Sequence, residues 1–289
     1  MTSAANLFAS PTPIEGFNEL LPNATPSAVE LNANAVFAFY SEDDNEMRIG
    51  SASLIKVTNK ELVTELFFLT NEHVVRKDCP TDGPCKGINL FQQANIKKSS
   101  LFGSKLLSSK GFTGAEYEVI KRSLNPDLAI IKMIVPLDNT ISIPKPVKIS
   151  PSCSNPTQRK VYTIGFSGTD LRTAAGSKPI PFNDYQHKRW SEGIEVSYHK
   201  EILENQEGRY LSTTVDILPG GSGGPLLNEK GEMIGVMTAT GSGRSNGYKY
   251  FGNEDPKNLD WTSLAVTCDL LREFILSANM EINSQEDCR

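Results

Sequence analysis

The stretch Gly220-Gly221-Ser222-Gly223-Gly224-Pro225 places one hydroxyl in a loop that carries almost no other side chain. Glycine accepts backbone angles and close approaches that other residues do not tolerate. A serine with such neighbours is open to a bulky substrate, and the surrounding backbone amides can point at one oxygen of that substrate. The stretch therefore predicts a nucleophile with an oxyanion hole at Ser222, and a plain Gly-Ser surface turn is the alternative.

The positions of the histidines decide which kind of serine site is available. The pattern Gly-x-Ser-x-Gly also occurs in α/β-hydrolases, where the histidine follows the serine in the chain. All three histidines here (His73, His187 and His199) precede Ser222. The residues after Ser222 predict a β-hairpin with a polar turn at Asn228-Glu229-Lys230-Gly231, whereas a subtilisin-type site needs a helix there. The order that remains is His, Asp, Ser.

His73 and Asp127 both border apolar runs. Phe67-Phe68-Leu69 predicts a buried strand that delivers His73 just past its end. Asp127 stands directly before the very apolar segment Leu128-Ala129-Ile130-Ile131. Taken singly, each residue is more often structural than catalytic. Together they suit catalysis, because a partly buried carboxylate can accept the histidine N–H and hold its tautomer.

Three segments in this order resemble the trypsin-like serine proteases of the chymotrypsin clan. They are Thr70-Asn71-Glu72-His73-Val74-Val75, Asp127-Leu128-Ala129-Ile130-Ile131-Lys132 and Gly220-Gly221-Ser222-Gly223-Gly224. The likeness is greatest to the bacterial branch that includes the high-temperature-requirement proteases and the glutamyl endopeptidases. It covers about residues 35–240 and is poor over 169–208. The resemblance implies an all-β fold of two six-stranded Greek-key β-barrels with a C-terminal helix.

The resemblance also implies a serine endopeptidase that works through an acyl-enzyme. Ser222 would be the nucleophile, His73 the base, Asp127 the orienting carboxylate, and the amides of Gly220 and Ser222 the oxyanion hole. The partner would be a peptide or protein substrate, and neither a cofactor nor a metal is expected. A pseudoprotease, in which the same scaffold binds a protein partner without turnover, is the alternative.

The resemblance assigns the substrate-binding pocket to two segments, which are Asp216, Ile217, Leu218 and Pro219 and then Thr238, Ala239 and Thr240. Asp216 stands where trypsin carries its specificity aspartate, which favours Lys or Arg before the cut bond. The second segment resembles the high-temperature-requirement proteases, which prefer small aliphatic residues. Both preferences stay open at this point. Met237 occupies the position where glutamyl endopeptidases carry a histidine, which argues against an acidic preference.

The resemblance, together with composition and pattern, implies four parts of the chain. We expect a flexible lead-in over residues 1–30, a first β-barrel over 31–138, a second over 139–258, and a helix with a tail over 259–289. Helical periodicity predicts that the C-terminal helix begins after Trp261, with Thr262 as its N-cap. Residues 169–208 are expected to be an insertion beside the second barrel, because the family usually has shorter connections there.

The net charge of −5 gives no support for a nucleic-acid or anionic-membrane partner, and no run of 18 apolar residues predicts a membrane span. Cysteine spacing suggests bridges between Cys79 and Cys85 and between Cys268 and Cys288, with Cys153 left over and other pairings open. Bridges favour a secreted or periplasmic protein whose signal peptide has been removed, and a cytoplasmic location is the alternative. The sequence predicts no oligomeric state.

Overall fold

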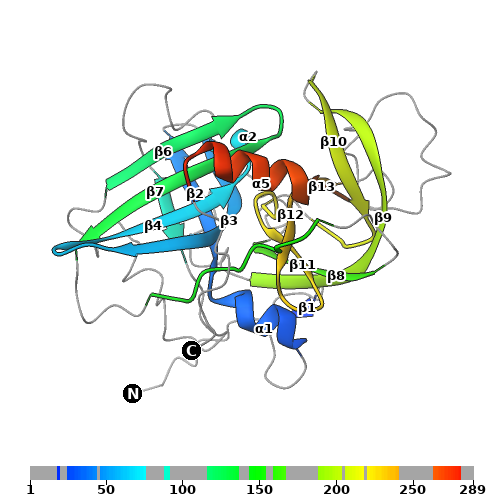
Figure 1. The fold of residues 1–289 in the computed structure, drawn as a ribbon, viewed down its shortest axis with the longest axis horizontal. Coiled ribbons are helices and arrows are strands. Elements are labelled where there is room, and N and C mark those ends of the chain that lie inside the picture. Colours follow the sequence, from blue (N-terminus) through cyan, green and yellow to red (C-terminus); the bar gives the residue numbers. More distant parts are fainter. Residues whose placement is uncertain are drawn as a thin grey trace, which may run out of the picture.

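The protein consists of two antiparallel β-sheets that stand side by side, as seen in a computed structural model (Figure 1). The structure describes residues 18–19, 25–43, 46–75, 88–91, 116–136, 143–153, 159–166, 188–203, 206–217, 220–240 and 263–280. Within these residues, no helix has the length and apolar character needed to cross a membrane.

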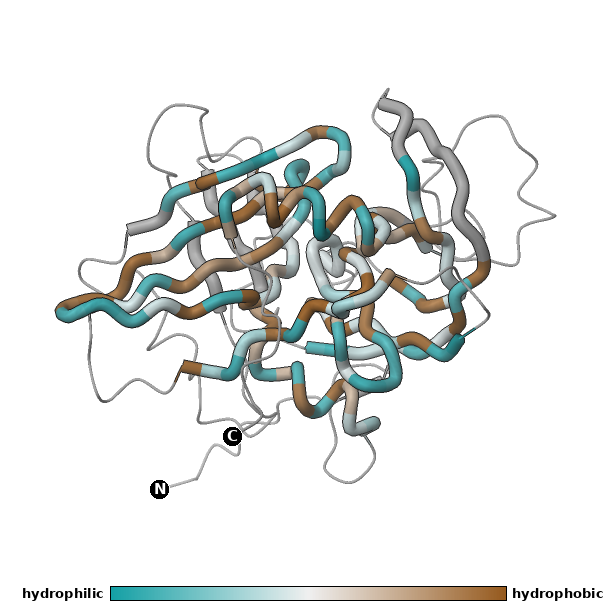
Figure 2. Tube along the Cα trace, in the orientation of Figure 1, coloured by the Kyte–Doolittle hydropathy of each residue, from teal (hydrophilic) through white to brown (hydrophobic). Residues whose placement is uncertain are grey.

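The first sheet has six strands in the order β5-β2-β3-β4-β7-β6. Their bounds are β2 (Val36–Asp43), β3 (Glu46–Asn59), β4 (Val63–Thr70), β5 (Ile88–Phe91), β6 (Glu116–Ser123) and β7 (Leu128–Pro136). Side chains alternate across the pleat, so Leu66 and Phe68 of β4 both point into the core. Phe68 meets Phe37 of β2 edge-on, with ring centroids 5.0 Å apart. In Figure 2 brown and teal stretches follow one another along the coloured parts of β4 and β6.

The second sheet is ordered β1-β9-β10-β13-β12-β11-β8, and a β8–β9 pairing closes six of its strands into a barrel. Its strands are β1 (Asn18–Glu19), β8 (Lys160–Phe166), β9 (Lys188–Leu203), β10 (Gln206–Thr213), β11 (Pro225–Asn228), β12 (Met233–Thr240) and β13 (Ser263–Thr267). The hairpin predicted after Ser222 is confirmed as β11–β12. In its turn, the side chain of Asn228 accepts hydrogen bonds from the amides of Lys230 and Glu232.

Two of the three described helices pack on the second sheet. Helix α1 (Ser27–Ala33) buries Val29, and the side-chain Nδ2 of Asn32 donates to the carbonyl of Gly231 at 2.8 Å in the β11–β12 turn. Helix α5 (Cys268–Ser277), red in Figure 1, lies where the sheets meet. It packs on β12 and β13 of the second sheet, and Lys121 of β6 donates to the carbonyl of Ser277 at 2.8 Å.

Three boundaries differ from the sequence expectation. Residues 18–19 and 27–30, expected in the flexible lead-in, form β1 and the start of α1. Helix α1 forms there because Ala28 and Val29 are apolar enough to be buried. Residues 188–203 and 206–208, expected in an insertion, belong to β9 and β10 of the barrel itself. Residues 263–267, expected to be helical and outside the second barrel, form β13 between β10 and β12. The helix therefore begins at Cys268, with Thr267 rather than Thr262 at its N-cap.

The disulfide also differs from the pairing that the cysteine spacing suggested. Cys268 is bonded to Cys153, with Cα atoms 5.4 Å apart, and not to Cys288. The reason is topological, since the segment between the barrels runs past the start of α5 and brings together residues 115 positions apart. The other three cysteines lie outside the described residues, so the Cys79–Cys85 bridge stays a prediction.

Candidate active site

The serine loop, which we define as residues 220–224, is held against the first sheet by backbone contacts. The amide of Ser51 in β3 donates to the carbonyl of Ser222 at 2.7 Å. Within the second sheet, Gly223 N–H donates to the carbonyl of Met237 at 2.8 Å. Gly220 and Gly223 have φ angles of 98° and 89°, in the left-handed region that favours glycine. The glycines predicted around the serine are thus required by the path of the loop.

His73 and Asp127 face each other across the end of the first barrel. His73 lies in the short helix α2 (Glu72–Val75), two residues past the Asn71 that follows β4, and Asp127 directly precedes β7. The imidazole Nδ1 is 2.6 Å from Oδ2 of Asp127, and the His73 backbone N–H donates to Oδ1 at 3.0 Å. The amide side chain of Asn71 donates to the Asp127 carbonyl at 2.8 Å, which fixes the backbone that carries the acid.

Asp127 is held as a carboxylate although it is buried. Burial by itself raises the pKa of a carboxyl group, because it disfavours the charged form. The hydrogen bond and charge of His73, together with a hydrogen bond from Thr238, outweigh this effect and lower the pKa of Asp127 below its usual value. The group therefore stays ionised near neutral pH, and its negative charge faces the imidazole.

Thr238 of β12 connects the acid to the serine. Its hydroxyl donates to Oδ2 of Asp127 at 2.6 Å, and its carbonyl accepts the hydroxyl of Ser222 at 3.2 Å. The pair of His73 and Asp127 and the hydroxyl of Ser222 are therefore gathered around one residue. Sequence reasoning assigned Thr238 only to the substrate pocket and missed its hydrogen bond to the acid. The only signal for this hydrogen bond in the sequence is a hydroxyl side chain directly after the apolar residue Met237.

The structure describes only some of the remaining residues that were predicted to line the substrate pocket. Asp216 is half-buried, and its backbone N–H donates to the hydroxyl of Ser191 at 3.0 Å. Ile217 is 6% exposed and packs in a core cluster of the second barrel together with Met237. Ala239 is half-buried in β12, next to Thr240 at the strand end. Leu218, Pro219 and the side chain of Thr240 lie outside the described residues.

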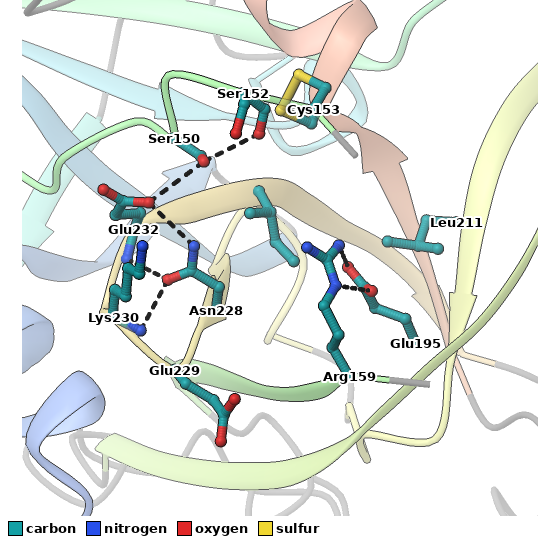
Figure 3. A pocket seen from close by; sticks show the side chains of 12 residues that line it. Ser150, Ser152, Cys153, Arg159, Glu195, Leu211, Asn228, Glu229, Lys230 and Glu232 are labelled. Atoms are coloured by element: carbon teal, nitrogen blue, oxygen red, sulfur yellow. Dashed lines mark hydrogen bonds and ion pairs between the residues drawn. A yellow bond between two sulfur atoms is a disulfide. The ribbon is translucent and has the colours of Figure 1, made fainter. Parts of the chain in front are cut away.

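A separate cavity of about 190 Å³ lies in the second barrel, and neither His73, Asp127 nor Ser222 lines it (Figure 3). Its polar groups bind one another. Arg159 makes two hydrogen bonds of 2.8 Å to the buried carboxylate of Glu195, and Glu232 accepts from Asn228 and Ser150. Because these groups satisfy each other, we interpret them as structural. Over the same described residues, no cluster of three or more His, Cys, Asp or Glu side chains is arranged to hold a metal ion.

Comparison with known families agrees with this geometry. The family model of the trypsin-like peptidase domain matches residues 50–236, which include His73, Asp127 and Ser222. The chain belongs to the trypsin-like peptidase family. The double-barrel fold expected from the sequence agrees with this membership.

Individual proteins resemble this chain either over a short stretch or at low sequence identity. HhoB of Synechocystis sp., whose name places it among the serine proteases, is 64% identical over 31 residues, which are 11% of this chain and only 8% of HhoB. A serine endoprotease from Yersinia pestis has the same fold at 18% identity and a TM-score of 0.50, covering 87% of this chain and 65% of that one. An inactive mutant form of Rv3671c from M. tuberculosis H37Rv matches at 12% identity and a TM-score of 0.53, over 92% of this chain and 100% of that one. At these identities the solved structures support the fold alone.

Proposed function

We propose that this protein is a serine endopeptidase that hydrolyses peptide bonds in peptide or protein substrates. Ser222 is the nucleophile, His73 is the general base, and Asp127 orients the imidazole. The amides of Gly220 and Ser222 hold the oxyanion. The observation that carries the proposal is the 2.6 Å contact between His73 and an acid kept ionised. Because Asp127 occupies Nδ1, it is Nε2 that exchanges protons with the substrate and Ser222.

The reaction has two balanced halves. In the first, Oγ of Ser222 attacks the carbonyl carbon, and its proton passes to Nε2 of His73. The C–N bond then breaks, and the amine leaves with that proton, which produces the acyl-enzyme ester. In the second half, water attacks the ester and gives a proton to His73. The ester C–O bond breaks, and His73 returns the proton to Ser222. Asp127 remains ionised and stabilises the imidazolium in both halves.

The substrate backbone is expected to lie along the end of β12. The segment from Thr238 to Thr240 would accept it as an additional antiparallel strand, which gives affinity without demanding a particular side chain. The residue before the cut bond would sit between this segment and the segment from Asp216 to Pro219.

A fluorophosphonate probe tests the proposal, because it reacts only with an activated serine. We expect the wild-type protein to be labelled, and we expect Ser222→Ala to lose labelling while it keeps the circular dichroism and unfolding temperature of the wild type. Ser152→Ala, which changes an exposed serine away from the site, is the matched control and should label normally. A folded wild-type protein that is not labelled would contradict the proposal and favour a scaffold that binds partners without turnover.

A further inference from the structure

Ser51 of β3 links the first barrel to the serine loop through its side chain as well as its backbone. Ser51 is fully buried. While its amide holds the carbonyl of Ser222, its hydroxyl donates to the carbonyl of Gly220 at 2.8 Å. The same hydroxyl accepts the backbone N–H of Phe166 at 3.0 Å, and Thr70 donates to the Ser51 carbonyl at 2.7 Å. Donor and acceptor capacity of the hydroxyl are therefore both used, which fixes its direction.

The serine loop needs such support at this place. Gly220 and Gly221 are consecutive glycines, and two glycines leave the peptide between them little steric resistance to rotation. The Gly220 carbonyl belongs to that peptide. A carbonyl oxygen that turned toward the substrate would place negative charge where the oxyanion develops and would oppose its stabilisation. The hydrogen bond from Ser51 keeps this oxygen directed at β3.

The surroundings are built for the contact. A Cβ atom on Gly165, the residue before Phe166, would come within 3.2 Å of both the Ser51 hydroxyl and the Cα of Gly221. Both distances are tighter than ordinary van der Waals contact. The bare backbone of Gly165 thus permits the hydroxyl and the loop to approach each other.

We propose that Ser51 is a positioning residue for the oxyanion hole, acting through the carbonyl of Gly220 and not through contact with substrate. This inference rests on the proposed function, because that function places the backbone amides of Gly220 and Ser222 in the oxyanion hole. It extends that function by assigning part of the oxyanion geometry to a side chain of the first barrel, which sequence reasoning did not single out.

The test compares Ser51→Ala with Ser53→Ala. Ser53 lies on the same strand and is 1% exposed, and its hydroxyl has no hydrogen-bond partner in the described part of the chain. We expect Ser51→Ala to lower kcat on a peptide substrate about 10- to 100-fold, somewhat less than the loss of a whole oxyanion donor. KM should change less than about threefold, because ground-state binding is untouched. Ser53→Ala should keep both constants. Equal kcat in the two variants would overturn the proposal.

A second readout does not require activity. Amide hydrogen exchange over the peptide that contains Gly220 to Gly224 should be at least about tenfold faster in Ser51→Ala than in Ser53→Ala, because one anchor of the loop is missing. Unchanged exchange would overturn the role of Ser51 even in an active enzyme. If the wild type is not labelled by fluorophosphonate but exchange still accelerates, the proposed function fails while Ser51 remains the anchor of the loop.

Discussion

At the scale of single residues, the site depends on how one buried carboxylate is satisfied. Asp127 accepts hydrogen bonds from the backbone and ring of His73 and from the hydroxyl of Thr238. A carboxylate bonded in this way has few orientations left, so the imidazole is fixed with it. The contribution of Asp127 to stability follows from its lowered pKa. It is present above the unfolded-state pKa of about 4 and is lost as the pH falls through the lower folded-state value.

Thr238→Val tests the contribution of the hydroxyl, because valine keeps the shape and removes the donor. A hydrogen bond to a charged group contributes about 1.5–3 kcal/mol, so we expect kcat/KM to fall about 10- to 100-fold. The pKa of Asp127 should rise, since this hydrogen bond helps to lower it. Because this carboxylate faces the His73 imidazole, a carboxylate that binds protons more readily also stabilises the imidazolium. The acidic limb of the pH–rate profile should then move to higher pH. Thr64→Val, at another buried threonine, is the control and should leave the profile unchanged. An unshifted acidic limb in Thr238→Val would contradict the assigned role.

Lys188 is a second buried charge-bearing residue, and its behaviour should be visible in stability. It is 3% exposed, lies over the ring of Phe166 and donates to the carbonyl of Ala33 at the end of α1. Burial lowers the pKa of Lys188 to about 7. The unfolded chain has a lysine pKa near 10.4, so between about pH 7 and pH 10 the unfolded state binds one proton more than the folded state. Stability from this group therefore rises with pH across that window.

Lys188→Met is expected to be more stable than the wild type at pH 7, and this advantage should shrink by roughly 1 kcal/mol per pH unit up to about pH 10. Urea unfolding at several pH values measures the difference. Lys160→Met, at a lysine whose side chain is 45% exposed, is the control and should show no such trend. Parallel stability curves for wild type and Lys188→Met would mean that Lys188 is not neutralised by folding.

At the scale of elements, the structure separates what sequence patterns can indicate from what they cannot. The hairpin after Ser222 and the strands that bracket His73 and Asp127 were predictable, because turn residues and apolar runs act locally. The periodicity after Trp261 predicts a helix where Ser263–Thr267 form β13, because every residue of this strand is buried and a fully buried strand shows no alternation. The pairing of Cys153 with Cys268, the hydroxyl of Thr238 on Asp127 and the contact of Ser51 with Gly220 depend on tertiary neighbours, which no local pattern encodes.

At the scale of the whole molecule, the site is completed only when the two barrels meet. The first barrel supplies His73 and Asp127, and the second supplies Ser222 and Thr238. The close approach of the backbones at this junction is what Ser51 and Gly223 make possible. A Cβ atom added to Gly223 would lie 1.9 Å from the Ser51 carbonyl oxygen and 2.3 Å from the Thr70 hydroxyl. Both atoms belong to the first barrel, so an added methyl group would push the barrels apart.

Gly223→Ala is therefore expected to lower the free energy of unfolding by about 2–5 kcal/mol through backbone strain and overpacking, and to abolish labelling of Ser222. Gly231→Ala is the matched control, because Gly231 also has a positive φ, of 76°. An added Cβ there would first meet the side-chain amide of Asn32, at 2.9 Å, which can shift more easily than backbone. It should cost only about 1–2 kcal/mol and leave labelling intact. Urea unfolding and fluorophosphonate labelling measure both effects. Equal destabilisation in the two variants, with labelling retained, would contradict this prediction. It would show that an added methyl group fits at Gly223 and that contact between the barrels does not set the geometry of the serine loop.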